Sequence, residues 1–285
     1  MYKFGLLLSV CLVSTVSLAD NVILMIGDGM GVNHLKCAAQ DKSLYLNSLP
    51  VKGKVHTYSA DNKITDSAAS ATAYSCGQKT NNSFLGKLPN QEDCETIAEE
   101  AVRKGYLVGI YSNDKTTGAT PSAFYAHVTN RHDDEKINAD RANAAQMMDI
   151  AVPVGKISNE VTRRLEKLSN SSDKKGFFAM FEGAKIDKRS HDNKLEEMKK
   201  ELYDFDYAVM KASNFVYKNP ETTLVVLADH ETGGLTDDCR FTSNWHTAAD
   251  IPLYAYGKHA KLFEGIQDNT DIYKKIKSIL FSTNN

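Results

Sequence analysis

The sequence predicts an α/β fold with a mostly parallel central sheet and helices on both of its faces. Four apolar runs have the length of buried strands, and the segments between them carry apolar residues at helical spacing. This alternation is typical of a parallel sheet, whose strands are buried on both faces and are apolar throughout. The four runs cover residues 22–26, 106–111, 176–181 and 224–228.

The length and composition fit one domain spanning residues 20–285. The chain has 285 residues, of which 42% are hydrophobic, so it can bury a sizeable core. It contains no internal repeat and no low-complexity linker that would divide it. The formal net charge is −2 and the lysines are scattered, so we expect no nucleic acid as a binding partner.

Residues 1–19 are typical of a secretory signal peptide. Lys3 precedes an apolar run over residues 4–16, and the small residues Ser17 and Ala19 stand before a cut after Ala19. The run is too short to span a membrane comfortably, and no other segment is apolar enough to do so. We therefore expect an exported protein, periplasmic or secreted, with no membrane span.

The cysteines agree with export. Four of them remain after the predicted cut, and an even number in an exported protein permits two disulfides. No two of them form a Cys-x-x-Cys pair, so we do not expect them to bind a metal. The sequence leaves the pairing open among Cys37, Cys76, Cys94 and Cys239.

The first apolar run leads into a turn that carries a carboxylate. Residues 22–26 are followed by the letters GDGMG, in which Asp28 is the second residue. A dinucleotide-binding turn would need a glycine where Val32 stands, and it has no use for a carboxylate beside a pyrophosphate. Asp28 is therefore interpreted as a metal ligand or as a turn former.

A second stretch places a serine at the start of a helix. Ser67 directly follows Asp66, and only small residues come after it until Tyr74, which favours a helix with an uncrowded N-terminus. The free N–H groups of such an end attract an anion, so the Ser67 hydroxyl would lie beside an anion site. Taken alone, the stretch favours an ordinary N-cap at Asp66 or Ser67.

The remaining elements continue the alternation. Residues 80–91 are polar and predict a surface loop, and residues 112–121 are polar or small and predict a loop. Residues 195–216 alternate apolar and charged side chains at helical spacing, which predicts a long amphipathic helix, and residues 252–256 predict a last strand. Further helices are expected over residues 92–104, 122–128, 137–150, 158–168 and the C-terminal tail.

Ligand-type side chains follow three of the four apolar runs. Asp28 follows the first run, Glu182 the third, and the pair Asp229-His230 the fourth. Because the carboxyl ends of parallel strands meet at one edge of a sheet, we expect these side chains to converge on one crevice. Carboxylates together with histidine suit Zn²⁺ or Mg²⁺, with histidine favouring zinc.

Two more ligand candidates lie beyond the third run. Asp187 and His191 are four residues apart, so on a helical turn they share a face. Each such piece alone has an ordinary explanation, as a surface pair or as a turn after a strand. Several ligand-rich strand ends together predict a metal site. The other histidines are interpreted as ordinary surface or core residues: His34, His56, His127, His132 and His259.

With these motifs in place, the chain resembles the metal-dependent alkaline phosphatases of the bacterial type, from residue 22 to about residue 257. The resemblance implies an alkaline-phosphatase-like fold and rests on six motifs in the family's order. They are GDGMG at 27–31, TDSAASAT at 65–72, Ala119-Thr120-Pro121 with Arg131 ten residues after the proline, EGAKID at 182–187 with His191, Ala228-Asp229-His230, and His246-Thr247.

The resemblance implies two zinc ions and one magnesium ion. Paired zinc ions about 4 Å apart stabilise both the entering and the leaving oxygen of an in-line displacement. The implied ligands are Asp28, Asp229, His230 and the Ser67 oxygen for one zinc, Asp187, His191 and His246 for the other, and Asp28, Thr120 and Glu182 for magnesium.

The resemblance also implies the reaction, which is the hydrolysis of phosphate monoesters through a phosphoserine on Ser67. The guanidinium of Arg131 would clamp the phosphate with two parallel hydrogen bonds, and Asp66 would orient Arg131. Lys188 follows Asp187 as in the bacterial members, which use a lysine near the phosphate.

The chain departs from the family's pattern at two places. Gly118 stands where many members carry Asp or His to support magnesium, so magnesium is the least supported of the three ions. A short loop separates His230 from His246, where longer members insert a crown that helps build the dimer interface. A homodimer and a monomer both stay open. Trp245, in that loop, is interpreted as a pocket wall or as a packing residue.

Two alternatives use the same scaffold. One is a phosphodiesterase, although members with that activity often place threonine as the nucleophile. A sulfatase is disfavoured because the motif Cys/Ser-x-Pro-x-Arg is absent after Ser67. The other is a non-catalytic exported protein that binds metal or phosphate, which a missing nucleophile or ligand would favour. Only the side chain at Gly118 is missing.

Overall fold

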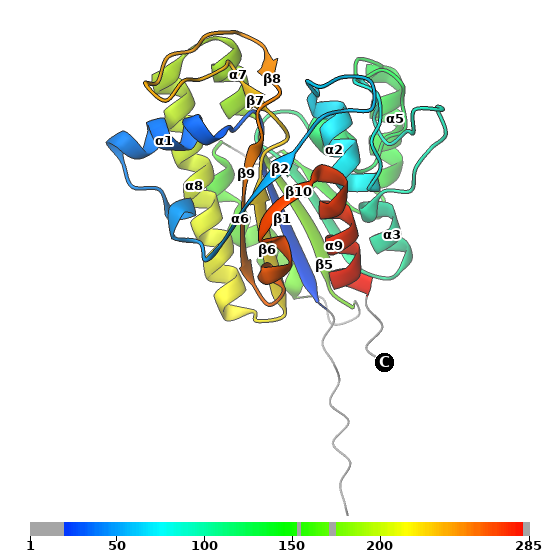
Figure 1. Ribbon diagram of the computed structural model, residues 1–285. Coiled ribbons are helices and arrows are strands. Elements are labelled where there is room, and N and C mark those ends of the chain that lie inside the picture. The colour runs from blue at the N-terminus through cyan, green and yellow to red at the C-terminus, as the bar shows by residue number, and fades with distance from the viewer. Residues whose placement is uncertain (1–19, 153–154, 171–174, 282–285) are drawn as a thin grey trace, which may run out of the picture.

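An eight-stranded sheet runs through the middle of the molecule and carries helices on both faces (Figure 1). The computed structural model describes residues 20–152, 155–170 and 175–281. The spatial order of the strands is β10-β2-β9-β6-β1-β5-β3-β4. Their bounds are β1 Asn21–Gly27, β2 Val51–His56, β3 Leu107–Ser112, β4 Asp149–Ala151, β5 Phe177–Gly183, β6 Thr222–Leu227, β9 Ile251–Gly257 and β10 Gly265–Asp268.

The sheet is mostly parallel, which confirms the predicted fold class. Strand β1 lies between β5 and β6 and pairs parallel with both. Within the eight-stranded sheet, β9 alone runs against its neighbours, pairing antiparallel with β6 and β2. The parallel strands end at the same edge of the sheet, so their C-terminal residues meet there.

The helices form two layers. On one face, α8 (Leu195–Lys218) contacts β1, β5, β6 and β9, with α6 (Val161–Ser169) and α1 (Val32–Asp41) beside it. On the other face, α9 (Asn269–Phe281) contacts β1, while α3 (Ile97–Arg103) contacts β3 and β5. Helix α2 (Ser67–Cys76) packs between α9 and α3 and is buried along its whole length. Figure 1 shows the two layers on either side of the sheet.

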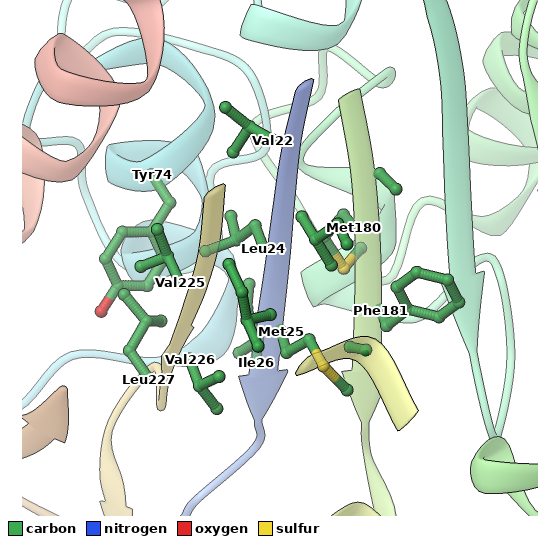
Figure 2. Packing of buried hydrophobic residues seen from close by; sticks show 14 of the residues in the cluster. Val22, Leu24, Met25, Ile26, Tyr74, Met180, Phe181, Val225, Val226 and Leu227 are labelled. Carbon is green, nitrogen blue, oxygen red and sulfur yellow. The ribbon is translucent and has the colours of Figure 1, made fainter. Parts of the chain in front are cut away.

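The central strands carry the apolar core (Figure 2). Residues 22–26 of β1, 177–181 of β5 and 224–227 of β6 are all buried, with exposures of 0 or 1%. Full burial of one Val, Leu, Ile or Phe side chain stabilises a fold by about 1.5–3 kcal/mol. The unbroken apolar runs in the sequence arise because helices cover both faces of these strands.

Three predicted helices have different bounds in the structure. Residues 92–96 are not helical, because the Thr96 hydroxyl accepts a hydrogen bond from the Glu99 N–H and caps α3 at its start. Residues 123–128 are not helical either: α4 (Ala119–Ser122) ends first, and Val128 then pairs with Leu85 in an extended bridge. Helix α5 (Asp134–Ala144) ends before residue 149, where β4 begins.

Three strands of the sheet were not predicted: β2, β10, and β4, whose first two residues fall in the helix expected over 137–150. Strands β2 and β10 lie together at one edge of the sheet, and β10 follows residues 252–256, which are therefore not the last strand. Neither strand is an apolar run, because alternate side chains of β2 face solvent. Strands with one solvent-facing side lack the continuous apolar run that marks a fully buried strand.

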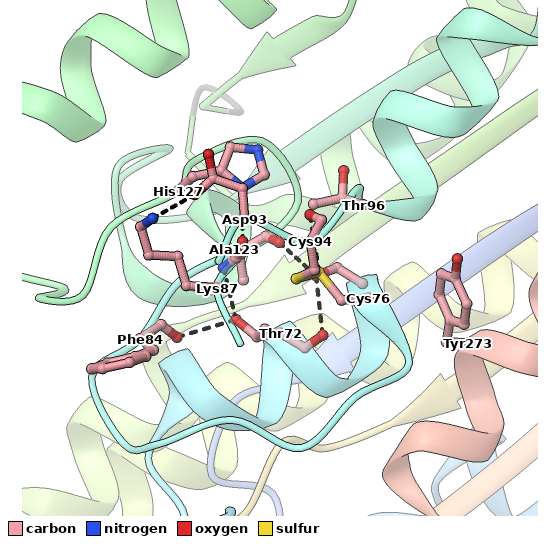
Figure 3. Close-up of a disulfide and its surroundings, with 12 residues drawn as sticks. Thr72, Cys76, Phe84, Lys87, Asp93, Cys94, Thr96, Ala123, His127 and Tyr273 are labelled. Carbon is pink, nitrogen blue, oxygen red and sulfur yellow. Dashed lines mark hydrogen bonds and ion pairs between the residues drawn. A yellow bond between two sulfur atoms is a disulfide. The ribbon is translucent and has the colours of Figure 1, made fainter. Parts of the chain in front are cut away.

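The four cysteines described form two disulfides, as the even count permits. Cys76 at the end of α2 bonds to Cys94, which fastens α2 to the loop before α3 (Figure 3). Cys37 in α1 bonds to Cys239, in the loop between residues 233 and 245. This second bond joins residues 202 positions apart.

The predicted signal peptide lies outside the described residues, so it stays a prediction. Within the described ranges, no helix is both long enough and apolar enough to cross a membrane.

We predict that the two disulfides stabilise the fold to different extents. In the chain-entropy view, closing a loop of 202 residues contributes about 5 kcal/mol and closing one of 18 residues about 3 kcal/mol. Urea unfolding should therefore show a larger loss for Cys37→Ser with Cys239→Ser than for Cys76→Ser with Cys94→Ser. An equal or reversed order would contradict the entropic explanation.

Candidate metal centre and active site

The candidate site lies beyond the carboxyl ends of three neighbouring strands. Asp28 follows β1, Glu182 lies at the end of β5, and Asp229 lies two residues beyond β6. Ile26 of β1 is level with Glu182 on one side and with Leu227 on the other, so Asp28 and Asp229 both lie two residues beyond the level of Glu182, at the same edge of the sheet. The structure therefore brings together the strand-end residues that the sequence singled out.

Asp28, Asp229 and His230 form a first ligand cluster. One potential ligand atom from each residue lies within 4.8 Å of the other two. His230 Nε2 is 3.5 Å from Asp28 Oδ1 and 3.2 Å from Asp229 Oδ2. All three side chains are buried, yet neither of these carboxylate oxygens has a hydrogen-bond partner of good geometry among the described residues. A bound cation would satisfy both oxygens.

The pKa shifts of the buried carboxylates also favour a bound cation. Burial raises the pKa of Asp28 well above its usual range, and the carboxylates of Asp229, Asp187 and Glu182 raise it further. Burial likewise raises the pKa of Glu182 to about 7. Burial opposes the charge of Asp229 too, but His230 holds the pKa of Asp229 below its usual value. Divalent cations would reverse this repulsion.

Asp187, His191 and His246 form a second ligand cluster. Helix α7 (Lys185–His191) carries the first two on one face, and the short strand β8 (His246–Thr247) brings in the third. His191 Nε2 lies 3.3 Å from both Asp187 Oδ1 and His246 Nε2, and His246 Nε2 lies 3.7 Å from Asp187 Oδ1. Ligand atoms of Asp187, His230 and His246 also lie within 4.8 Å of one another, so His230 borders both clusters.

Each of the three histidines is held through its other ring nitrogen. His191 Nδ1 lies 2.6 Å from the Asn244 carbonyl, and His246 Nδ1 lies 3.0 Å from the Thr65 carbonyl. A carbonyl only accepts, so both Nδ1 atoms carry the proton and both Nε2 atoms present a lone pair. Two lone pairs 3.3 Å apart repel each other unless a cation lies between them. This is the arrangement of zinc-binding histidines.

Thr232 links the two clusters and was not predicted from the sequence. Its hydroxyl donates to Asp187 Oδ1 at 2.6 Å, and it therefore accepts from His230 Nδ1 at 3.1 Å. One side chain thus sets the tautomer of His230 and orients a carboxylate of the second cluster. Gly29 leaves space for the Thr232 hydroxyl, because a Cβ at position 29 would lie 2.7 Å from it. The φ of 71° at Gly29 also favours glycine. A threonine two residues after a ligand histidine is the only sequence sign of this role.

Ser67 is positioned by the face of α2 that packs on β6. The Ser70 hydroxyl donates to the Asp229 carbonyl, and the Tyr74 hydroxyl donates to the Ala228 carbonyl, both at 2.7 Å. Residues 67, 70 and 74 share one helix face, so these bonds aim Ser67 at the end of β6. Ser67 Oγ lies 3.1 Å from His230 Nε2. The N-cap is Asp66, whose carboxylate accepts from the Ala69 N–H.

Arg131 lies beside Asp66 at the edge of a cavity. Arg131 Nη1 donates to Asp66 Oδ2 at 3.0 Å, and the Ser83 N–H donates to the same oxygen. The cavity has a volume of about 690 Å³. Ser67 and ligands of the second cluster open into it, together with Arg131. The full lining is Asn62, Ile64, Thr65, Asp66, Ser67, Asn82, Ser83, Arg131, His132, Asp187, His191, Trp245 and His246.

The predicted magnesium ligands also lie together. The buried Thr120 hydroxyl and the Ser112 hydroxyl face the Glu182 carboxylate, and both oppose the rise of the Glu182 pKa. Gly118 caps α4 at its start and brings no side chain to this group, as the sequence indicated.

Lys188, which the resemblance places near the phosphate, pairs with Asp114 in the structure. Its ammonium pairs with Asp114 Oδ2 at 2.5 Å, and its side chain is half exposed. Lys188 is not among the described residues that line the cavity. Asp114 also raises the pKa of Glu182, so Lys188 neutralises a carboxylate that borders the predicted magnesium ligands.

Comparison with known proteins matches this arrangement to one family. The sequence model of the family described as alkaline phosphatase matches residues 19–162, 156–240 and 236–281. The chain belongs to the alkaline phosphatase family. Alkaline phosphatase 3 of Bacillus subtilis is 28% identical over 91% of this chain and 71% of its own length. The alkaline phosphatase of Schizosaccharomyces pombe is 30% identical over 75% of this chain and 56% of its own length.

Solved alkaline phosphatases share the fold. The enzyme from the Antarctic bacterium TAB5 superposes with a TM-score of 0.84 and 27% identity, covering 92% of this chain and 98% of that chain. A mutant of the same enzyme, with magnesium bound, gives the same TM-score. The present chain spans about half to seven-tenths of the length of the first curated relatives.

We predict that metal binding stabilises this alkaline phosphatase family member through Asp28. With chelator present, Asp28→Asn should unfold at a higher temperature than the wild type, because it removes one of the crowded buried carboxylates. Added zinc should stabilise the wild type by about 4 kcal/mol at about 1,000 times its Kd. It should stabilise Asp28→Asn much less.

Thermal unfolding with chelator and with zinc measures both effects. The exposed Asp237→Asn is a charge-matched control that should behave as the wild type. Equal stabilisation of Asp28→Asn and the wild type by zinc would show that Asp28 is not a ligand.

Proposed function

We propose that this protein is a metal-dependent phosphomonoesterase that transfers phosphate to Ser67 and then to water. The observation that carries the proposal is the position of the Ser67 hydroxyl. It stands at the N-terminus of a buried helix, 3.1 Å from His230 Nε2 and beside the Asp66–Arg131 pair. Helix N–H groups and a guanidinium both favour a phosphate at this point.

The two ligand clusters would each hold a zinc ion, and Asp28, Thr120 and Glu182 would hold magnesium. The fit rests on the unpaired oxygens of Asp28 and Asp229 and on the inward Nε2 atoms of three histidines. When bound, such ions lower the pKa of a nearby hydroxyl and stabilise charge on the entering and leaving oxygens.

The chain's own residues would carry out the remaining work. Arg131 would hold two phosphate oxygens, and Asp66 would keep the guanidinium in place through the bond at 3.0 Å. The Ser67 oxygen attacks phosphorus from the side opposite the leaving group, so a Ser67–phosphorus bond forms as the ester bond breaks and the alcohol leaves. Water then attacks the phosphoserine, which releases inorganic phosphate and restores Ser67.

We further propose that the protein acts after export. The residues typical of a signal peptide and the two disulfides both support this location. A substrate outside the cytoplasm would therefore be a small phosphate monoester in the periplasm or the medium.

The deciding experiment is hydrolysis of a chromogenic aryl phosphate at alkaline pH by the purified chain without residues 1–19. The assay is run as isolated, after chelation, and after zinc is returned with or without magnesium. Loss on chelation and recovery with zinc are expected, and the magnesium arm measures what Gly118 costs. A parallel aryl phosphodiester arm tests the alternative activity. A folded, zinc-loaded sample inactive on the monoester would refute the proposal.

We predict that two variants separate chemistry from binding. Ser67→Ala should lower kcat by about 10³-fold or more, because no covalent intermediate forms, while inorganic phosphate still binds. Arg131→Ala should chiefly raise KM, because a charged hydrogen-bond pair of about 1.5–3 kcal/mol is lost. Steady-state kinetics and phosphate inhibition measure both, with the exposed Ser169→Ala as control. Unchanged kcat in Ser67→Ala would remove Ser67 from the reaction.

A further inference from the structure

One side of the cavity is apolar and exposed. Trp245 and Ile64 both line it, with exposed fractions of 71% and 41%. Trp245 is the single tryptophan of the chain. An exposed indole contributes little hydrophobic stabilisation to the fold. At the mouth of a cavity, it therefore indicates a contact with a molecule that enters the cavity.

The backbone of Trp245 is fixed on both sides. Its carbonyl accepts from the Gly233 N–H at 2.8 Å, and its N–H donates to the Ser243 hydroxyl at 2.9 Å. The indole meets the His191 ring edge-on, with the planes at 90° and the centroids 5.9 Å apart. Since Asn244 and Asp187 hold His191, the indole is anchored directly beside the second ligand cluster.

The rest of the lining is polar. Arg131 and His132 contribute cationic or polar groups, and Asn62 and Asn82 contribute amides. The phosphate end of a substrate belongs with Ser67 and Arg131. The other end of the ester then lies against Trp245 and Ile64. These two side chains form an apolar wall that a flat hydrophobic group can cover.

We propose that Trp245 determines specificity by binding the leaving group, and that the preferred substrates are phosphate monoesters of planar aromatic groups. This inference rests on the proposed phosphomonoesterase activity. Aryl phosphates and nucleoside monophosphates share the required flat π-face. Stacking of one base on an aromatic side chain is commonly worth about tenfold in affinity or more. Aliphatic esters such as glycerol phosphate gain nothing from it.

The kinetic test compares phenyl phosphate, a nucleoside 5′-monophosphate and glycerol 1-phosphate. Trp245→Ala should lower kcat/KM for the two aromatic esters by about tenfold, mainly through KM, and for glycerol 1-phosphate by less than about twofold. Trp245→Phe should restore most of the aromatic preference. Tyr217→Ala removes an aromatic side chain that is 79% exposed elsewhere on the surface, and it should match the wild type. The two aromatic arms distinguish an aryl ester from a nucleotide as the better substrate.

A second measurement does not depend on turnover. Because Trp245 is the single tryptophan, its emission reports directly on this wall. In zinc-loaded Ser67→Ala, a nucleoside 5′-monophosphate should quench the emission, whereas inorganic phosphate and glycerol 1-phosphate should leave it nearly unchanged.

The outcomes separate the two proposals. Equal losses for all three esters in Trp245→Ala, or no quenching by the nucleotide, would overturn the specificity role and leave the phosphatase standing. Absence of hydrolysis of every ester by the wild type would instead refute the activity, and the fluorescence arm would then decide alone whether the wall binds aromatic groups.

Discussion

The structure depends on one electrostatic constraint: four carboxylates are buried together where the central strands end. Asp28, Glu182, Asp187 and Asp229 all lie within or beside the two ligand clusters. In a protein interior such groups repel each other and lose their hydration, so they accumulate only where cations compensate them. The fold therefore supplies the scaffold, and a bound cation would offset the repulsion between these carboxylates.

Precision at the site comes from groups that never touch a substrate. Backbone carbonyls hold two of the ligand histidines by Nδ1, and Thr232 holds the third. Helix α2 is fixed to the end of β6 by Ser70 and Tyr74, which sets the place of Ser67. Segments far apart in the chain thus meet with defined tautomers and directions, and little rearrangement is left for the reaction itself.

The sequence was most informative where burial is complete. Strands β1, β5 and β6 and helix α8 were predictable, because both faces of the strands and one stripe of the helix are apolar. Strands β2 and β10, at one end of the sheet, were not, since solvent on one face removes the apolar pattern. The meeting of Asp28, Glu182 and Asp229 was predictable from the strand ends. Thr232 and the cysteine pairing were not, because they depend on contacts between distant segments.

The bond between Cys37 and Cys239 has a consequence for how the chain matures. A protein is made from its N-terminus, so Cys37 has no correct partner until 202 further residues exist. Cys76 and Cys94 appear first and are near each other in sequence. Thiol exchange can join Cys37 to either of them in the meantime, and such a link would have to be broken before α1 reaches its place. The loop before His246 can therefore reach its native arrangement only after Cys239, the last cysteine of the chain, has been synthesised.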